Sequence, residues 1–140
     1  MHTRRTWRVG DSHTLFRRFT TGDITNFSSI SGDTNPVHFS ATAAASLGFP
    51  KGILVPGLLT QSVFSAVMAC HIPGPGSIYM SQTSRFRAPI YVDDEVRYHV
   101  EITKVRPENK MYWISQKAFV GDTLVMDGEA IGQNKTCHFE

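Results

Sequence analysis

An aspartate and a histidine stand five residues apart in a segment that is predicted to be neither helix nor strand. Asp33 and His38 flank the polar, proline-containing run Thr34-Asn35-Pro36-Val37, which is typical of a stiff loop. Such a loop can fold a carboxylate and an imidazole toward one point, where they hold a water molecule between them. An imidazole that titrates near neutral pH can take a proton from that water. The alternative is a turn in which Asp33 caps backbone amides and His38 packs against its neighbours.

Gly57 adds a third chemical feature, because it opens a long apolar segment that is predicted to be a helix. Unpaired backbone N–H groups and the positive end of the helix dipole meet at such a position, which favours an oxygen that gains negative charge. Glycine has no Cβ, so a substrate carbonyl can come close. A thioester carbonyl held there would be polarised, and a double bond next to it would become receptive to water.

The sequence lacks the residue patterns of several other functions. The two adjacent Cys-His pairs do not have metal-ligand spacing, so we expect no metal, and no cofactor-binding glycine motif or nucleophile elbow is found. A net charge of +2 with scattered Lys and Arg gives no reason to expect a nucleic acid as partner. The longest apolar run, residues 57–70, is interrupted by polar side chains, so we expect no membrane span.

Each of two groups of basic residues can be interpreted in two ways. Arg85 and Arg87 are two apart in a predicted strand and therefore share one face. They are either solvated surface arginines or a docking point for an anionic partner or a phosphate-bearing substrate. Residues 1–8 are expected to be a flexible basic arm, and the first eighteen residues contain five arginines. This start is either an exposed arm or the remnant of a mitochondrial transit peptide.

The elements that must position these residues divide the chain into two halves. With 140 residues, 41% of them hydrophobic, residues 1–140 are expected to form a single domain. In the N-terminal half, a capping box at Thr20 predicts a helix that ends near Gly32, and Ser40 is predicted to cap a second helix, Ala41 to Leu47. The segment from Gly57 toward Pro73 is apolar around most of its circumference, which predicts a helix enclosed by other structure.

In the C-terminal half, the hydrophobic pattern changes to the two-residue period that is typical of strands. In residues 96–103, apolar and polar residues alternate, and similar runs occupy 77–88, 111–120 and 123–132, with a first strand near 14–20. An antiparallel sheet that curls around the apolar helix satisfies both patterns, because each element buries the apolar face of the other. The fold class predicted from the residues is therefore α+β, with a curled sheet wrapped around one long helix.

The order of these residues resembles that of a known family. The segment Gly32-Asp33-Thr34-Asn35-Pro36-Val37-His38, followed by Phe49, Gly57, Leu59 and Ser65, is similar to the hydratase motif of the MaoC-like, (R)-specific enoyl-thioester hydratases and dehydratases. The Pro73-Gly74-Pro75-Gly76 turn and the Ser81-Gln82 step look most like the eukaryotic mitochondrial 3-hydroxyacyl-thioester dehydratase type 2. The resemblance implies a hot-dog fold, a homodimer, and an acyl chain that lies along the dimer seam.

The resemblance also assigns roles. It gives Asp33 and His38 the handling of the water, and the Gly57 N–H the thioester oxygen. Ser65 matches a serine near the family's site, although it could equally be a small polar residue facing a neighbour on its helix. Asn35 is grouped with the substrate-binding residues and is expected to fix the loop. The chain departs from the family where Pro56 replaces a histidine before the glycine and where the turn after Phe49 is one residue longer.

The function that the resemblance implies is reversible hydration and dehydration between (R)-3-hydroxyacyl and trans-2-enoyl thioesters of coenzyme A or an acyl carrier protein. This reaction needs no cofactor, because the thioester itself accepts the electrons. The expected location is the mitochondrial matrix, or otherwise the cytoplasm. Two alternatives stay open, namely a non-catalytic acyl-thioester-binding partner subunit of a heterodimer and a thioesterase.

Overall fold

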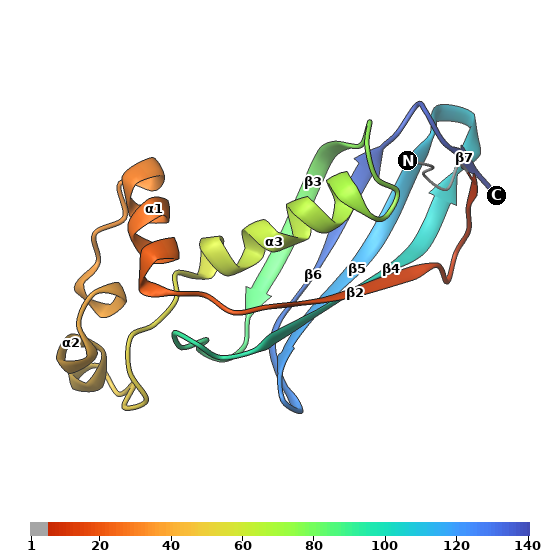
Figure 1. Cartoon of the computed structure of the whole chain (residues 1–140). Coiled ribbons are helices and arrows are strands. Elements are labelled where there is room, and N and C mark those ends of the chain that lie inside the picture. Colours follow the sequence, from red (N-terminus) through yellow and green to blue (C-terminus); the bar gives the residue numbers. More distant parts are fainter. Residues whose placement is uncertain (1–5) are drawn as a thin grey trace.

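Five antiparallel strands and one long helix dominate the computed structural model, which describes residues 6–140. The strands are ordered β2-β4-β5-β6-β3, and the helix α3 lies along one face of the sheet (Figure 1). A two-stranded parallel sheet, β1-β7, joins the two ends of the described chain. The elements are β1 Thr6–Trp7, β2 Ser12–Arg17, α1 Thr21–Ser31, the 3-10 helix η1 Pro36–His38, α2 Ala41–Ser46, α3 Gly57–Cys70, β3 Ile78–Phe86, β4 Val96–Arg106, the 3-10 helix η2 Pro107–Asn109, β5 Met111–Val120, β6 Thr123–Gln133 and β7 His138–Phe139.

The core lies between the sheet and α3, as the alternating pattern predicts. The inward-facing residues of β4, Val96, Tyr98, Val100 and Ile102, are fully buried. From the other side, α3 contributes its buried face, which includes Thr60, Val63, Phe64, Val67 and Met68. The predicted α+β architecture, a curled antiparallel sheet around a long apolar helix, is confirmed.

The sheet covers only one side of α3. Leu58 is 63% exposed on the opposite side, and Ser65 and Ala69 are exposed there too. The predicted enclosure of the helix is therefore incomplete within one chain, because no other element of the described residues is packed on that face. No helix in residues 6–140 is long and apolar enough to span a bilayer.

The N-terminal segment departs from the predicted boundaries in two places. The predicted strand near 14–20 is β2, which ends at Arg17, because Thr20 is occupied in capping α1: its Oγ1 accepts the Asp23 N–H at 3.1 Å. The predicted flexible arm, residues 1–8, extends too far toward the C-terminus, because Thr6 and Trp7 form β1 and pair with β7. The remainder of that arm, residues 1–5, lies outside the described residues.

Two short helices stand beyond the end of the sheet, on the side where α3 begins (Figure 1). As predicted, the Thr20 and Asp23 capping box opens α1, and Ser40 caps α2 by accepting the Ala43 N–H. Gly32 ends α1 in the left-handed conformation, at a φ of 79°, which glycine adopts without a steric penalty. The chain then enters the loop that carries Asp33 and His38.

Candidate active site

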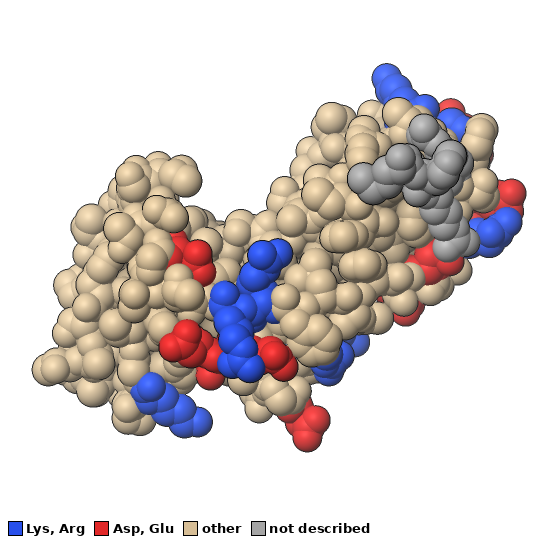
Figure 2. Space-filling model, viewed as in Figure 1, with Lys and Arg blue, Asp and Glu red and all other residues tan. Residues whose placement is uncertain are grey.

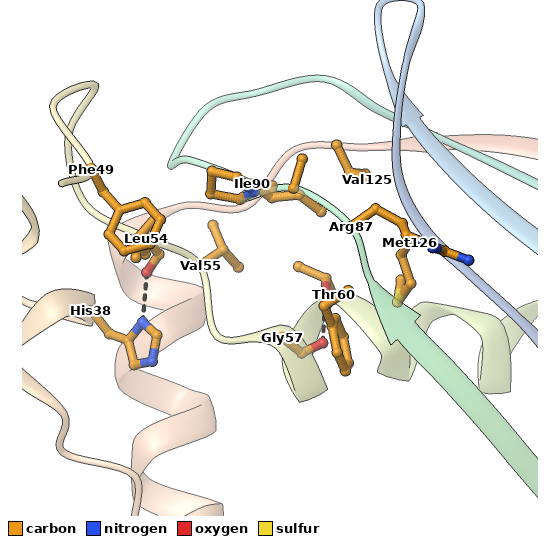
Figure 3. A pocket seen from close by; sticks show the side chains of 13 residues that line it. His38, Phe49, Leu54, Val55, Gly57, Thr60, Arg87, Ile90, Val125 and Met126 are labelled. Carbon is orange, nitrogen blue, oxygen red and sulfur yellow. Dashed lines mark hydrogen bonds between the residues drawn. The ribbon is translucent and has the colours of Figure 1, made fainter. Parts of the chain in front are cut away.

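The imidazole of His38 is fixed by an extended segment that leads into α3. Residues 53–55 pair with residues 90–92 through the Val55 N–H to the Ile90 carbonyl at 2.8 Å and the Val92 N–H to the Ile53 carbonyl at 3.1 Å. This pairing holds the Leu54 carbonyl, which accepts a hydrogen bond from His38 Nδ1 at 2.8 Å (Figure 3). Because a carbonyl can only accept, Nδ1 carries the proton, and in the neutral ring Nε2 has a free lone pair.

Asp33 divides its two carboxylate oxygens between the loop and His38. Oδ1 accepts the Asn35 N–H at 3.0 Å, while Oδ2 lies 3.7 Å from His38 Nε2. This separation is too long for a direct hydrogen bond, and a single water molecule can contact both atoms. The Asp33 side chain is 36% exposed and that of His38 is 13% exposed, so the pair faces solvent from the carboxylate side. Asp33 thus caps a backbone amide, as one alternative predicts, and also faces His38, as the other requires.

The N-terminus of α3 presents backbone N–H groups without a side-chain cap. Pro56 is the N-cap residue and forms no capping hydrogen bond, and Gly57 is the first helical residue. A Cβ on Gly57 would lie 3.0 Å from a ring carbon of Phe86, so the aromatic ring packs directly on the glycine. The Pro56 carbonyl accepts the Thr60 N–H, so the proline starts the helix normally and leaves the Gly57 amide available.

A buried tyrosine ties this helix end to the sheet. Tyr98 on β4 donates its hydroxyl to the Thr60 carbonyl at 2.7 Å, and Thr60 Oγ1 donates to the Gly57 carbonyl at 2.6 Å. Burial raises the pKa of Tyr98 well above its usual value, so the hydroxyl stays protonated and acts as a donor. The position of Gly57 is therefore set by β4 through two hydrogen bonds.

A cavity of about 390 Å³ opens between His38 and Gly57. Figure 3 shows the imidazole on one side, Gly57 and Thr60 on another, and apolar side chains above them. A second hollow of about 460 Å³ contains Asp33, and Gly57 and Phe86 line both spaces. The cavity is lined by His38, Phe49, Leu54, Val55, Gly57, Thr60, Phe86, Arg87, Ala88, Pro89, Ile90, Val125 and Met126. A mostly apolar space with an imidazole at one wall and free N–H groups at another suits an acyl thioester.

The remaining predicted residues lie apart from this cavity or on its edge. Ser65 is exposed on the outer face of α3 and lines neither hollow. Asn35 fixes the loop, since its Oδ1 accepts the Val37 N–H at 3.3 Å, and it does not line the cavity. Arg87 lines the cavity and forms a two-pronged ion pair with Asp127, at 3.2 Å for each contact. Arg85 is opposite Asp127 in the β3–β6 register and does not reach the cavity.

Three contributors to the site are not predicted by the sequence. The Leu54 carbonyl, the Tyr98 hydroxyl and the ring of Phe86 act by position, and each comes from an element remote in sequence from the Asp33 loop. Every residue has a backbone carbonyl, so the type of residue 54 does not indicate that its carbonyl binds His38. Tyr98 falls in the alternating run 96–103 and Phe86 in the predicted strand 77–88, and neither position by itself indicates a contact with the site.

Comparison with known proteins agrees with this geometry. The family model described as "MaoC like domain" matches residues 10–120. A 3-hydroxybutyryl-CoA dehydratase from Methylorubrum extorquens is 39% identical over 88% of this chain and 78% of its own length. A mitochondrial 3-hydroxyacyl-acyl-carrier-protein dehydratase from Solanum lycopersicum is 37% identical over 88% of this chain and 74% of its own.

The solved structures extend this agreement to three dimensions. The (R)-hydratase from A. caviae involved in PHA biosynthesis superposes with a TM-score of 0.86 and 34% identity, covering 90% of this chain and 96% of that one. Bacterial and mitochondrial relatives match at similar identity. The hot-dog fold is shared, and the chain belongs to the MaoC-like family of (R)-specific hydratases and dehydratases.

Proposed function

We propose that this chain is a hydro-lyase that interconverts (R)-3-hydroxyacyl and trans-2-enoyl thioesters in fatty acid metabolism. The observation that carries the proposal is the His38 imidazole, fixed through Nδ1 on the Leu54 carbonyl, with Nε2 turned toward Asp33 Oδ2 at 3.7 Å. The relatives named as (R)-specific enoyl-CoA hydratases and 3-hydroxyacyl-thioester dehydratases support the same reaction class.

In the hydration direction, a water molecule lies between Asp33 and His38. His38 Nε2 takes one proton as the water oxygen bonds to C3, and the electrons of the double bond move toward the thioester oxygen. The Gly57 N–H stabilises the negative charge on that oxygen. The proton held on His38 Nε2 is then delivered to C2 with the help of Asp33, which completes the addition of water and returns the imidazole to its neutral form. Dehydration follows the same steps in reverse.

The substrate is a thioester of coenzyme A or of an acyl carrier protein. Arg85 and Arg87, which flank Asp127, are proposed as a contact for an acidic carrier protein. Charge reversal at both positions is then expected to weaken turnover of carrier-linked substrate more than turnover of coenzyme A-linked substrate. An equal loss on both substrates would discard this contact.

The active unit is proposed to be a homodimer, with Ser65 at the seam where the acyl chain lies. Support comes from the uncovered face of α3, on which Ser65 is exposed in the single chain. Membership of the mitochondrial type 2 group and location in the mitochondrial matrix stay predictions, motivated by the arginines near the start and by the mitochondrial relatives.

Hydration of crotonyl-CoA, followed by the loss of ultraviolet absorbance of its conjugated thioester, tests the mechanism. Asp33→Asn and His38→Asn should each lower kcat by about 10²-fold or more, because each removes a proton-handling group. Asp122→Asn, on the exposed β5–β6 turn, is the matched control and should keep full activity. Comparable rates in all variants would refute the mechanism. Binding without turnover would favour a partner subunit, and release of free thiol would favour a thioesterase.

A further inference from the structure

A hollow with a lysine at its wall adjoins the catalytic cavity. It has a volume of about 520 Å³, and four of its lining residues, Phe49, Ala88, Pro89 and Val125, also line the cavity that contains His38. These four residues form the rim between the two spaces. A ligand with its reacting end at His38 can therefore continue across this rim. Lys51 also lines this hollow, in the turn where the chain departs from the family pattern by one residue.

The hollow that contains Lys51 combines two features: it shares lining residues with the cavity, and it has a cation without an ion-pair partner among the described residues. The Asp33 hollow has no Lys or Arg in its lining. The hollow with Arg85 and Lys117 and the groove with Arg17 and Arg18 share no lining residue with the cavity. Arg87 lines the cavity itself, where it pairs with Asp127, and does not line the hollow that contains Lys51.

The charge of Lys51 is not compensated by a close partner. No carboxylate of the described residues lies within ion-pair distance of its ammonium group. Asp94 lines the same hollow, but its Oδ2 accepts the Tyr91 N–H at 2.9 Å and is held in its own turn. The apolar rim and the single free ammonium thus suit a ligand with a long neutral arm that ends in an anion.

We infer that this hollow holds the phosphopantetheine arm of the substrate and that Lys51 binds the arm's phosphate. The inference rests on the proposed function, in which the acyl group is carried as a thioester at the end of that arm. Coenzyme A and acyl carrier proteins both carry this phosphate, so the site recognises the part that the two carriers share. Lys51 is a binding residue for the phosphate of the arm and takes no part in the proton transfers.

The test compares Lys51→Glu with the wild-type protein on crotonyl-CoA and on the crotonyl thioester of N-acetylcysteamine, which has no phosphate. The KM for crotonyl-CoA should rise about fivefold to tenfold, with kcat unchanged, because one attractive contact becomes repulsive. The KM for the N-acetylcysteamine thioester should stay the same. Lys117→Glu, an equal charge change on the outer face of β5, should leave both KM values unchanged.

Titration calorimetry gives the same comparison without turnover. Free coenzyme A and 4′-phosphopantetheine should both bind more weakly to Lys51→Glu, and pantetheine, which has no phosphate, should bind equally to both proteins. A Lys51 effect on coenzyme A alone would overturn the inference, because the contact would then be to the nucleotide. Equal KM values on crotonyl-CoA, or an equal rise on both thioesters, would also overturn it. Loss of the proposed function is a separate result: the wild-type protein would then hydrate neither thioester.

Discussion

At the scale of single residues, the proposed role of Gly57 depends on how closely a substrate oxygen can approach its amide. Its backbone conformation is ordinary for a helix, so the absence of a side chain matters for space. A Cβ at this position would press on the Phe86 ring at 3.0 Å and would stand beside the amide that is proposed to receive the thioester oxygen.

Gly57→Ala is therefore expected to lower kcat/KM by about 10²-fold, because the carbonyl is displaced from the N–H by roughly the size of a methyl group. The fold should survive, since the Phe86 ring is half exposed and can move aside. The measurement is the hydration rate of crotonyl-CoA beside a thermal melt. A variant with the wild-type rate would show that Gly57 does not receive the thioester oxygen.

The sequence predicts these residues better than it predicts their orientation. The spacing of Asp33 and His38 around Pro36 indicated a loop that brings them together, and their atoms lie 3.7 Å apart. The direction of the imidazole could not be predicted, because it depends on the Leu54 carbonyl sixteen residues further on and on its pairing with residues 90–92. The surroundings of Ser65 could not be predicted either, because its side chain is exposed on the uncovered face of α3 in the single chain.

At the scale of elements, the close packing of a β3 side chain over β6 depends on Gly128. This residue on β6 stands between Ser84 on β3 and Gln116 on β5. Because it has no side chain, Gln82 can reach over it, donating from Nε2 to Gln116 Oε1 at 2.7 Å. A Cβ on Gly128 would lie 2.1 Å from the Thr83 carbonyl oxygen, which is far inside any real contact.

Gly128→Ala is expected to lower the free energy of unfolding by about 3 kcal/mol, because the backbone of β3 must shift. Gly22→Ala is the matched control: its Cβ would meet Thr20 Oγ1 at an ordinary 3.5 Å, and alanine is favoured in a helix, so stability should rise by about 0.5 kcal/mol. Urea midpoints measure both changes. An unchanged midpoint in Gly128→Ala would mean that the β3–β6 pairing is looser than described.

Element types follow from sequence more reliably than their ends. The periods of residues 96–103 and 111–120 predicted β4 and β5, yet β4 continues to Arg106 beyond its alternating stretch. The strands β1 and β7 were missed, because two-residue strands have no measurable period. They form only through pairing of the two ends of the chain.

The contact between β2 and the end of α3 makes stability depend on pH. The rings of His13 and His71 stack with centroids 4.2 Å apart. Burial lowers the pKa of His13, and the neighbouring His71 lowers it further. The unfolded chain, in which histidine titrates at about 6.5, therefore binds protons before the folded chain does as the pH falls.

The free energy of unfolding should accordingly decrease between pH 7.5 and 5.5, and the decrease should be smaller in His13→Gln. Urea unfolding at the two pH values measures this difference. His138→Gln, at an exposed position near the C-terminus, is the comparison variant and should keep the wild-type decrease. A His13→Gln protein with the full wild-type decrease would assign the acid sensitivity to other groups.

At the scale of the whole molecule, apolar side chains are exposed where a single chain has nothing to cover them. Ile78 and Met80 on β3 are 60% and 54% exposed, and Leu58 on α3 is 63% exposed. Among the described residues, β3 is an edge of the sheet and pairs only with β6, so its outer side has unpaired backbone groups. Much of the surface in Figure 2 is free of charge, and its basic side chains are mixed with acidic ones. An exposed apolar edge beside an uncovered helix face is typical of an interface between copies.

If β3 forms the seam of the proposed homodimer, Met80→Arg should separate the two copies, because it places a charge on the apolar edge. Light scattering should give twice the chain mass of 15.6 kDa for the wild-type protein and one chain mass for the variant. Activity should fall with the mass, since Phe86 at the end of the same strand packs on Gly57. Phe16→Arg, an equal change at a 58% exposed position on the opposite edge strand β2, should leave the mass and the rate unchanged. A fully active wild-type protein with the mass of one chain would show that α3 functions with its outer face in water.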